Sequence, residues 1–198
     1  MTVVLVALLA GAIAGVAGGG RPANLASARI RSGGLLLLGA GGQAAVGLAE
    51  LRGYPGLALV VASYAALAAF AVRNLAIAGM GVIVLGIVLN LIPIVADGGM
   101  PVEGTAIVRA HVAAPEDVPL LRYGGKRHLA HQGDHLRILD DRIPDWLTHE
   151  VLSAGDLVIG AGVAAVVARL LRGRRSLRRR RSPVAASSAA GSDRPATG

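Results

Sequence analysis

Long apolar stretches without charge dominate the first half of the chain. Residues 1–20, 53–72 and 74–96 contain no Asp, Glu, Lys or Arg. At a rise of about 1.5 Å per residue, a helix over any of these stretches can cross the roughly 30 Å of hydrocarbon in a bilayer. Two further apolar stretches lie at 32–49, which has no charged residue, and at 154–171, which contains Asp156 and Arg169. The pattern predicts an all-α membrane protein with about five transmembrane helices, at 3–18, 32–49, 56–72, 74–96 and 154–171.

Residues 97–153 have a different composition. They hold nine acidic and six basic residues, all five histidines and the only tryptophan. The segment is too polar to span a membrane and too long for a plain connector, so we expect a small extracytoplasmic loop subdomain packed on the membrane face. Within it, 106–112 and 136–143 fit either a strand or a short amphipathic helix. Tyr123 and Trp146 are expected at the level of the lipid head groups.

The arginines predict the orientation of the helices. Arg21, Arg29 and Arg31 follow the first predicted helix, Arg73 follows the third, and eight arginines lie between 169 and 181. Because Lys and Arg next to helices are retained on the cytoplasmic side, five helices place the N-terminus and the loop outside and the C-terminus inside. Arginine follows the first apolar stretch rather than preceding it, so we expect a retained helix and not a cleaved signal peptide. The predicted location is the bacterial inner (cytoplasmic) membrane.

The predicted organisation has four segments: helices one to four in 1–96, the extracytoplasmic loop in 97–153, helix five in 154–171, and a basic, then disordered, cytoplasmic tail in 172–198. Hydrophobic residues make up 54% and mean hydropathy is +0.60, which is more apolar than a soluble domain of 198 residues. The absence of cysteine excludes disulfides and thiolate metal ligands. The net charge of +8 belongs mainly to the tail, which indicates contact with anionic lipid head groups rather than specific nucleic-acid binding.

Polar residues gather near the predicted outer ends of the fourth and fifth helices. Ser153 and Asp156 have the spacing of a capping box, in which each side chain accepts a hydrogen bond from the other residue's backbone N–H. Asn90 is expected at the same depth, where its amide can bond to Asp156 across the helices. Gly11 and Gly15, with Gly19, have the four-residue spacing that lets helix backbones approach closely.

Three histidines have spacing typical of metal ligands. On a helix, His128, His131 and His135 would share one face, and three imidazoles with the neighbouring Asp134 could complete a tetrahedral zinc site. Gly133 weakens such a helix. A solvated, histidine-rich loop without metal is the alternative interpretation.

Several short motifs occur in a fixed order along the chain. They are N-L-x-x-x-G-M at 74–80, L-G-x-x-x-N at 85–90, D-G-G-M-P-V at 97–102 and S-x-G-D at 153–156. Their order and spacing, over roughly residues 1–172, resemble an uncharacterised family of bacterial multi-pass membrane proteins known only as a domain of unknown function. The family usually has Asn in place of Asp97. The resemblance implies membrane topology and no particular activity.

The matching positions are expected to meet at the outer ends of helices four and five, covered by the loop. The polar cluster so predicted comprises Asn90, Asp97, Asp140, Asp141, Ser153 and Asp156.

Our leading interpretation is an integral membrane protein with a structural or accessory role, which is not an enzyme and needs no cofactor. Its expected partners are the lipid bilayer and another membrane protein or a second copy of the chain. Two alternatives remain open. One is a small transporter or solute-binding membrane protein that uses the polar cluster, and the other is a metal-dependent membrane hydrolase that uses the loop histidines. No His-Glu-x-x-His motif, phosphate-binding loop or nucleophile elbow supports an enzyme.

Overall fold

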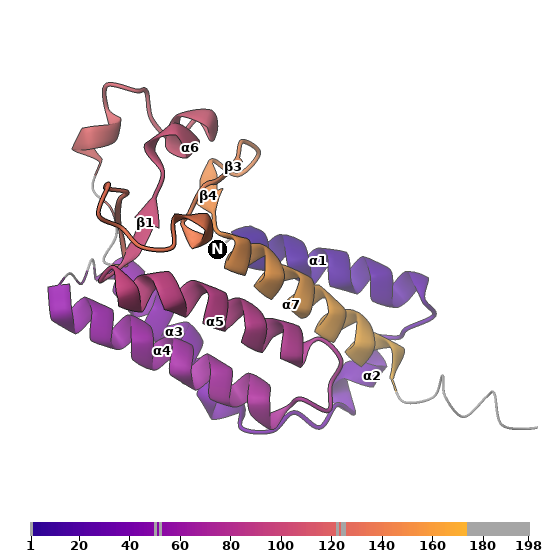
Figure 1. The fold of residues 1–198 in the computed structure, drawn as a ribbon. Coiled ribbons are helices and arrows are strands. Elements are labelled where there is room, and N and C mark those ends of the chain that lie inside the picture. The colour runs from indigo at the N-terminus through magenta and orange to yellow at the C-terminus, as the bar shows by residue number, and fades with distance from the viewer. Residues whose placement is uncertain (1, 50, 52, 122, 124–125, 174–198) are drawn as a thin grey trace, which may run out of the picture.

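The computed structural model describes residues 2–49, 51, 53–121, 123 and 126–173 (Figure 1). The fold is mostly helical, with a bundle of apolar helices and a smaller, mixed segment at one end. The helices outside that segment are α1 (Thr2–Ala17), the short α2 (Ala23–Ala26), α3 (Gly33–Leu48), α4 (Gly53–Arg73), α5 (Met80–Ala96) and α7 (Ala154–Arg172). The predicted tail lies outside the described residues from 174 onward.

Helix lengths distinguish two of the five long helices from the others. With 21 and 19 residues, α4 and α7 are long and apolar enough to cross a membrane, whereas α1, α3 and α5 are apolar but have 16, 16 and 17 residues. The fourth predicted helix begins at Met80 and not at residue 74. Its first six residues instead form a turn, because Asn74 bonds to the α2–α3 linker and Gly79 adopts φ +105°.

The helices pack in an order that differs from their order in the chain. The main contacts join α1 to α7, α7 to α5, α5 to α4 and α4 to α3 (Figure 1). The last helix therefore lies between the first and α5.

The interfaces between these helices are made by small residues. A Cβ added at Gly11 or Gly15 of α1 would overlap atoms of α7, and one at Gly86 of α5 would lie 2.8 Å from the carbonyl oxygen of Gly155. The spacing of Gly11 and Gly15 thus marks a helix interface as predicted. Gly19 does not belong to it, since it lies beyond the end of α1 with no atom near its Cβ position.

Large apolar side chains point away from the bundle. Several on the shorter helices are more than half exposed: Leu5, Leu9 and Ile13 on α1, Leu37 and Leu38 on α3, and Leu85 and Val95 on α5. Polar contacts lie inside instead, as where Gln43 Nε2 donates to Ser63 Oγ at 2.7 Å between α3 and α4. The bundle thus buries an apolar core together with small and polar residues, and it also presents many large apolar side chains on its outer surface.

Residues 97–153, which we call the cap, contain strands as well as helices. The strands are β1 (Met100–Val102), β2 (Arg127–Leu129), β3 (Ile143–Asp145) and β4 (Glu150–Leu152), and the helical turns are α6 (Gly104–Arg109), η1 (Val118–Leu120) and η2 (Arg137–Leu139). β1 pairs with β2 in parallel, and β3 pairs with β4 antiparallel. The all-α prediction is therefore wrong for the cap, because three-residue strands are too short to produce a recognisable alternation. The two ambiguous stretches, 106–112 and 136–143, form mainly helical turns.

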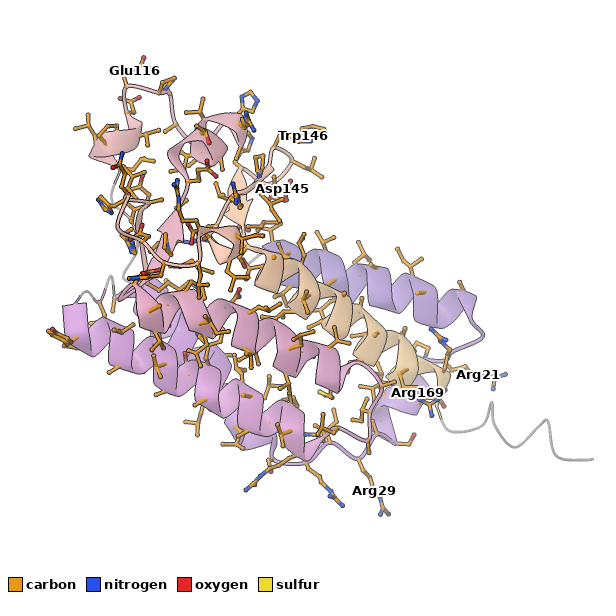
Figure 2. All side chains as sticks on the ribbon, viewed as in Figure 1. Arg21, Arg29, Glu116, Asp145, Trp146 and Arg169 are labelled. Carbon is orange, nitrogen blue, oxygen red and sulfur yellow. The ribbon has the colours of Figure 1, made fainter. Side chains whose placement is uncertain are left out.

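The two ends of the bundle differ in charge (Figure 2). At the end away from the cap, the backbone N–H of Arg21 donates to the Leu171 carbonyl, and Arg73 Nη1 donates to Ser32 Oγ at 3.0 Å. The labelled Arg21, Arg29 and Arg169 all lie toward this end, whereas Glu116, Asp145 and Trp146 lie on the cap.

Candidate functional site

Asn90 is the centre of a polar junction between α5 and α7. Its Nδ2 donates to Asp156 Oδ1 at 2.8 Å, and its Oδ1 accepts from Ser153 Oγ at 2.7 Å. The cross-helix bond inferred from the sequence is thus present. Asn90 and Ser153 are both buried, whereas Asp156 is half-buried. Gly155 permits this junction, because a Cβ there would overlap Asn90 Oδ1.

The predicted capping box is also present at the start of α7. The backbone N–H of Asp156 donates to Ser153 Oγ at 2.9 Å, while Asp156 Oδ2 accepts from the Ser153 N–H at 3.3 Å. The Asp156 carboxylate therefore accepts hydrogen bonds from two residues, Ser153 and Asn90. One oxygen caps its own helix, and the other holds Asn90 of the neighbouring helix.

Asp141 enters this region from the cap. Its backbone is fixed against β1, since its N–H donates to the Pro101 carbonyl and its carbonyl accepts from the Glu103 N–H. The side chain is 1% exposed, and Oδ2 lies 2.7 Å from Arg127 Nε without the alignment of a hydrogen bond. Burial raises the pKa of Asp141 to about 6, although the Arg127 charge acts in the opposite direction.

Lys126 joins the cap to α3. Its Nζ donates to Gln43 Oε1 at 3.2 Å. Burial lowers the pKa of the ammonium, and the neighbouring Arg127 lowers it further, while Asp156 and Asp141 favour the charged form. Lys126 thus contributes a buried positive charge beside two carboxylates.

A pocket of about 210 Å³, partly open to solvent, lies where these groups converge between the bundle and the cap. Its lining combines two basic and two acidic side chains with a phenol, an amide and two apolar residues: Lys126, Arg127, Asp141, Asp156, Tyr64, Asn90, Ile94 and Met100. The 210 Å³ includes space open to solvent, so the enclosed cavity is smaller than this and lies below the range of about 300–1,000 Å³ typical of pockets for organic ligands.

Asp97 and Asp140 lie apart from this pocket's lining. Asp97 Oδ1 accepts from both the backbone N–H and, at 2.9 Å, the ring Nδ1 of His135. Asp140 is buried, and burial, with the nearby Asp134 and Asp97 carboxylates, raises its pKa. Of the six predicted cluster residues, the structure joins Asn90, Ser153 and Asp156 by hydrogen bonds and brings Asp141 to the same pocket.

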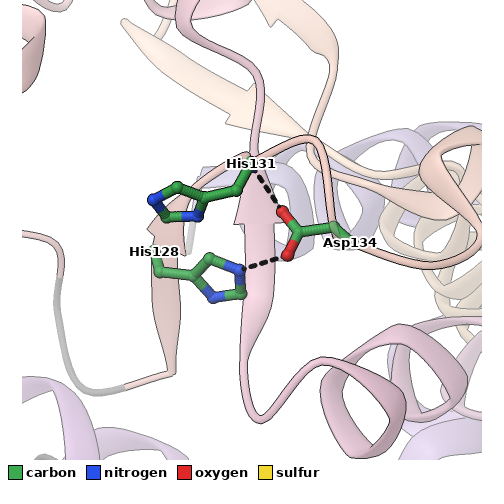
Figure 3. Close-up of side chains that lie close together, drawn as sticks. All are labelled: His128, His131 and Asp134. Atoms are coloured by element: carbon green, nitrogen blue, oxygen red, sulfur yellow. Dashed lines mark hydrogen bonds and ion pairs between the residues drawn. The ribbon is translucent and has the colours of Figure 1, made fainter.

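The three predicted metal ligands do not gather as one group. His128 lies on β2 and not on a helix, and His135 is held by Asp97. The group that does gather consists of His128, His131 and Asp134, whose potential ligand atoms all lie within 4.8 Å of one another (Figure 3). Asp134, and not His135, is thus the third member of this group.

Sequence reasoning missed Lys126 and Arg127 as members of the site. A signal was available for Lys126, because it is the only lysine in a chain with 19 arginines. The compact lysine ammonium suits a small buried space better than the planar guanidinium does. The position of Arg127 in the sequence gave no indication that its side chain lies beside Asp141.

The sequence matches a known protein family over more than half of its length. Residues 44–168 match the model of a family of unknown function (DUF5317). The chain belongs to the DUF5317 family. The matched region starts within α3 and ends within α7, so it contains the whole polar junction and the cap, while α1 lies outside it. No curated protein and no solved structure matches the chain.

Proposed function

We propose that this DUF5317 protein is a non-enzymatic integral protein of the bacterial inner membrane, with five transmembrane helices and a structural or accessory role. The observation that carries the proposal is the arrangement of side chains in the bundle. Leu5, Leu37 and Leu85 are more than half exposed on the outside, although the bundle already has an apolar core, close glycine contacts and hydrogen-bonded polar groups inside. Water would penalise so much exposed apolar surface, and lipid would not.

The shorter helices are compatible with this topology. At about 1.5 Å per residue, α1, α3 and α5 are about 24–26 Å long, a few ångströms less than an average hydrocarbon core. Local thinning of the bilayer and extension of flanking arginines toward the head groups accommodate a mismatch of this size. Helices α4 and α7 need no such adjustment.

The distribution of arginines supports an orientation with the cap outside the cytoplasm. Arg21, Arg73 and Arg172 all belong to the end of the bundle opposite the cap, and the other predicted tail arginines follow Arg172 in sequence. Basic residues beside transmembrane helices are retained in the cytoplasm, where they contact anionic lipid head groups.

The pocket supports a structural role more than transport. Its charges come as two acids and two bases, and its volume is small for an organic substrate. The side chains around it tie the cap to the bundle through Lys126 and Gln43. Exposed Trp146 and Leu147 at the cap surface offer contact with head groups or with a partner protein.

The topology can be tested with single cysteines, because the chain has none of its own. Glu116→Cys in the cap should react with a membrane-impermeant maleimide in intact cells. Ser27→Cys, at the arginine-rich end, should react only after the inner membrane is permeabilised. Labelling of Ser27→Cys alone in intact cells, or a chain that stays soluble without detergent, would refute the proposal. Crosslinking in native membranes then tests the accessory role by identifying a partner or a second copy.

A further inference from the structure

The cap contains a group of three potential metal ligands that the polar junction does not use. His128 Nε2 lies 3.3 Å from Asp134 Oδ1, and the rings of His128 and His131 stack with centroids 5.8 Å apart and an interplanar angle of 18° (Figure 3). The three side chains come from β2 and the turn after it, within seven residues of sequence.

The separation between His128 and Asp134 fits a common metal ion. With zinc-to-ligand distances of about 2.0–2.1 Å, two ligands at a tetrahedral angle lie about 3.3 Å apart. The third ligand, His131, lies within 4.8 Å of both, so a modest rotation of its exposed side chain brings it to the same ion. Two imidazoles and one carboxylate are a donor set that suits Zn²⁺ and similar divalent ions.

The surrounding contacts hold two of the ligands in position. Asp134 Oδ2 accepts from the His131 backbone N–H at 2.6 Å, which leaves Oδ1 directed at His128. Gly99 makes room for the His128 ring, because a Cβ at that position would lie 3.1 Å from Nδ1. Hydrogen bonds that orient metal ligands in this way raise the affinity of a site.

We propose that His128, His131 and Asp134 bind one divalent transition-metal ion, with Zn²⁺ as the expected occupant. The ion replaces the hydrogen bond between His128 Nε2 and Asp134 Oδ1. Because His131 is exposed, the remaining coordination position faces solvent and takes water. His135 lies outside this group, because the ligand atoms that gather within 4.8 Å belong to His128, His131 and Asp134.

The test uses the full chain in detergent, stripped of metal with a chelator and titrated with Zn²⁺ by calorimetry. The wild-type chain should bind one equivalent, and Co²⁺ in its place should give the visible absorption bands of a tetrahedral site. His131→Ala and Asp134→Asn should each weaken Zn²⁺ binding by about 100-fold or more, as expected for the loss of a direct ligand.

Two matched variants serve as controls. His135→Ala removes the histidine bound to Asp97, and His111→Asn removes an exposed cap histidine with φ +56°, a backbone conformation that Asn tolerates. Both should bind Zn²⁺ within about two-fold of the wild type. Zn²⁺ should also raise the melting temperature of the wild type and of both controls, but not that of Asp134→Asn. Absence of stoichiometric binding, or an equal loss in His135→Ala and His131→Ala, overturns the proposal.

Discussion

Asn90 and Asp156 stand 66 residues apart in sequence and are joined by a 2.8 Å hydrogen bond between α5 and α7. Asn90 also accepts from Ser153, so a single amide satisfies a donor and an acceptor on the neighbouring helix. Because Asn90 and Ser153 are buried, the Ser153 hydroxyl depends on Asn90 for a hydrogen bond that water does not supply. The start of α7 is therefore fixed by a residue of α5.

Asn90→Ala should lower stability. It leaves the Ser153 hydroxyl and one Asp156 oxygen without their bonds, at a cost of about 1–3 kcal/mol. The measurement is thermal or denaturant unfolding in detergent. Ser27→Ala is the control, because it removes an exposed hydrogen bond to Asn24 and should change stability by less than about 0.5 kcal/mol. Equal stability of the two variants would show that the junction does not support the bundle.

Gly155→Ala should separate α7 from α5. The added Cβ overlaps Asn90 Oδ1 and lies 2.9 Å from the Gly86 carbonyl oxygen, so the helices must move apart, at a cost of about 1–3 kcal/mol. Gly41→Ala provides the control, since its Cβ has no atom within 4 Å and it lies on an exposed face of α3. That variant should be neutral or more stable by up to about 1 kcal/mol. The close-approach argument fails if both substitutions have the same effect.

Asp141 should make stability depend on pH between about 4 and 6. Its pKa is about 6 in the folded chain against 3.8 ordinarily, so the folded state binds the proton more tightly than the unfolded state. This contribution is complete below pH 3.8 and is lost as pH rises through about 6, a change on the order of 3 kcal/mol. Unfolding measured across this range should show a steeper decline for wild type than for Asp141→Asn.

A matched substitution distinguishes the pH-dependent contribution of Asp141 from that of its neighbour Asp140. Asp140 is also buried, and its pKa is also raised, so Asp140→Asn should remove only its own contribution and leave the Asp141 decline in place. Identical pH profiles for wild type and Asp141→Asn would contradict the assignment.

Asn74→Ala should release the linker between α2 and α3. The Asn74 amide bonds to both the N–H and the carbonyl of Arg31 at 2.9 Å and also to the Phe70 carbonyl. Without it, trypsin should cut after Arg29 or Arg31 several-fold faster in membranes whose cytoplasmic face is accessible. Ser32→Ala, which loses only the bond from Arg73, should be cut at the wild-type rate.

Sequence reasoning predicted those features that depend on local composition or on helix geometry. The apolar helices follow from the absence of charge, and the Asn90 to Asp156 bond follows from their similar depth on neighbouring helices. The cap was predicted as a loop subdomain but its strands were not, because each has three residues and β1 pairs with a segment far along the chain. The grouping around His128 also differs from the predicted one, for a related reason. A helix would have placed His135 with His128, whereas the turn after β2 brings Asp134 there instead.

The position of α7 has a consequence for how the chain assembles. Helix α7, which is synthesised after α1 and α5, touches both of them, and α1 has its main contact with α7. Helices α3, α4 and α5 can pair as they are made, while α1 meets its main partner only after some 150 further residues have been synthesised. Completion of the bundle is therefore a late event, and a chain truncated before residue 154 should retain a paired core of three helices with a detached first helix.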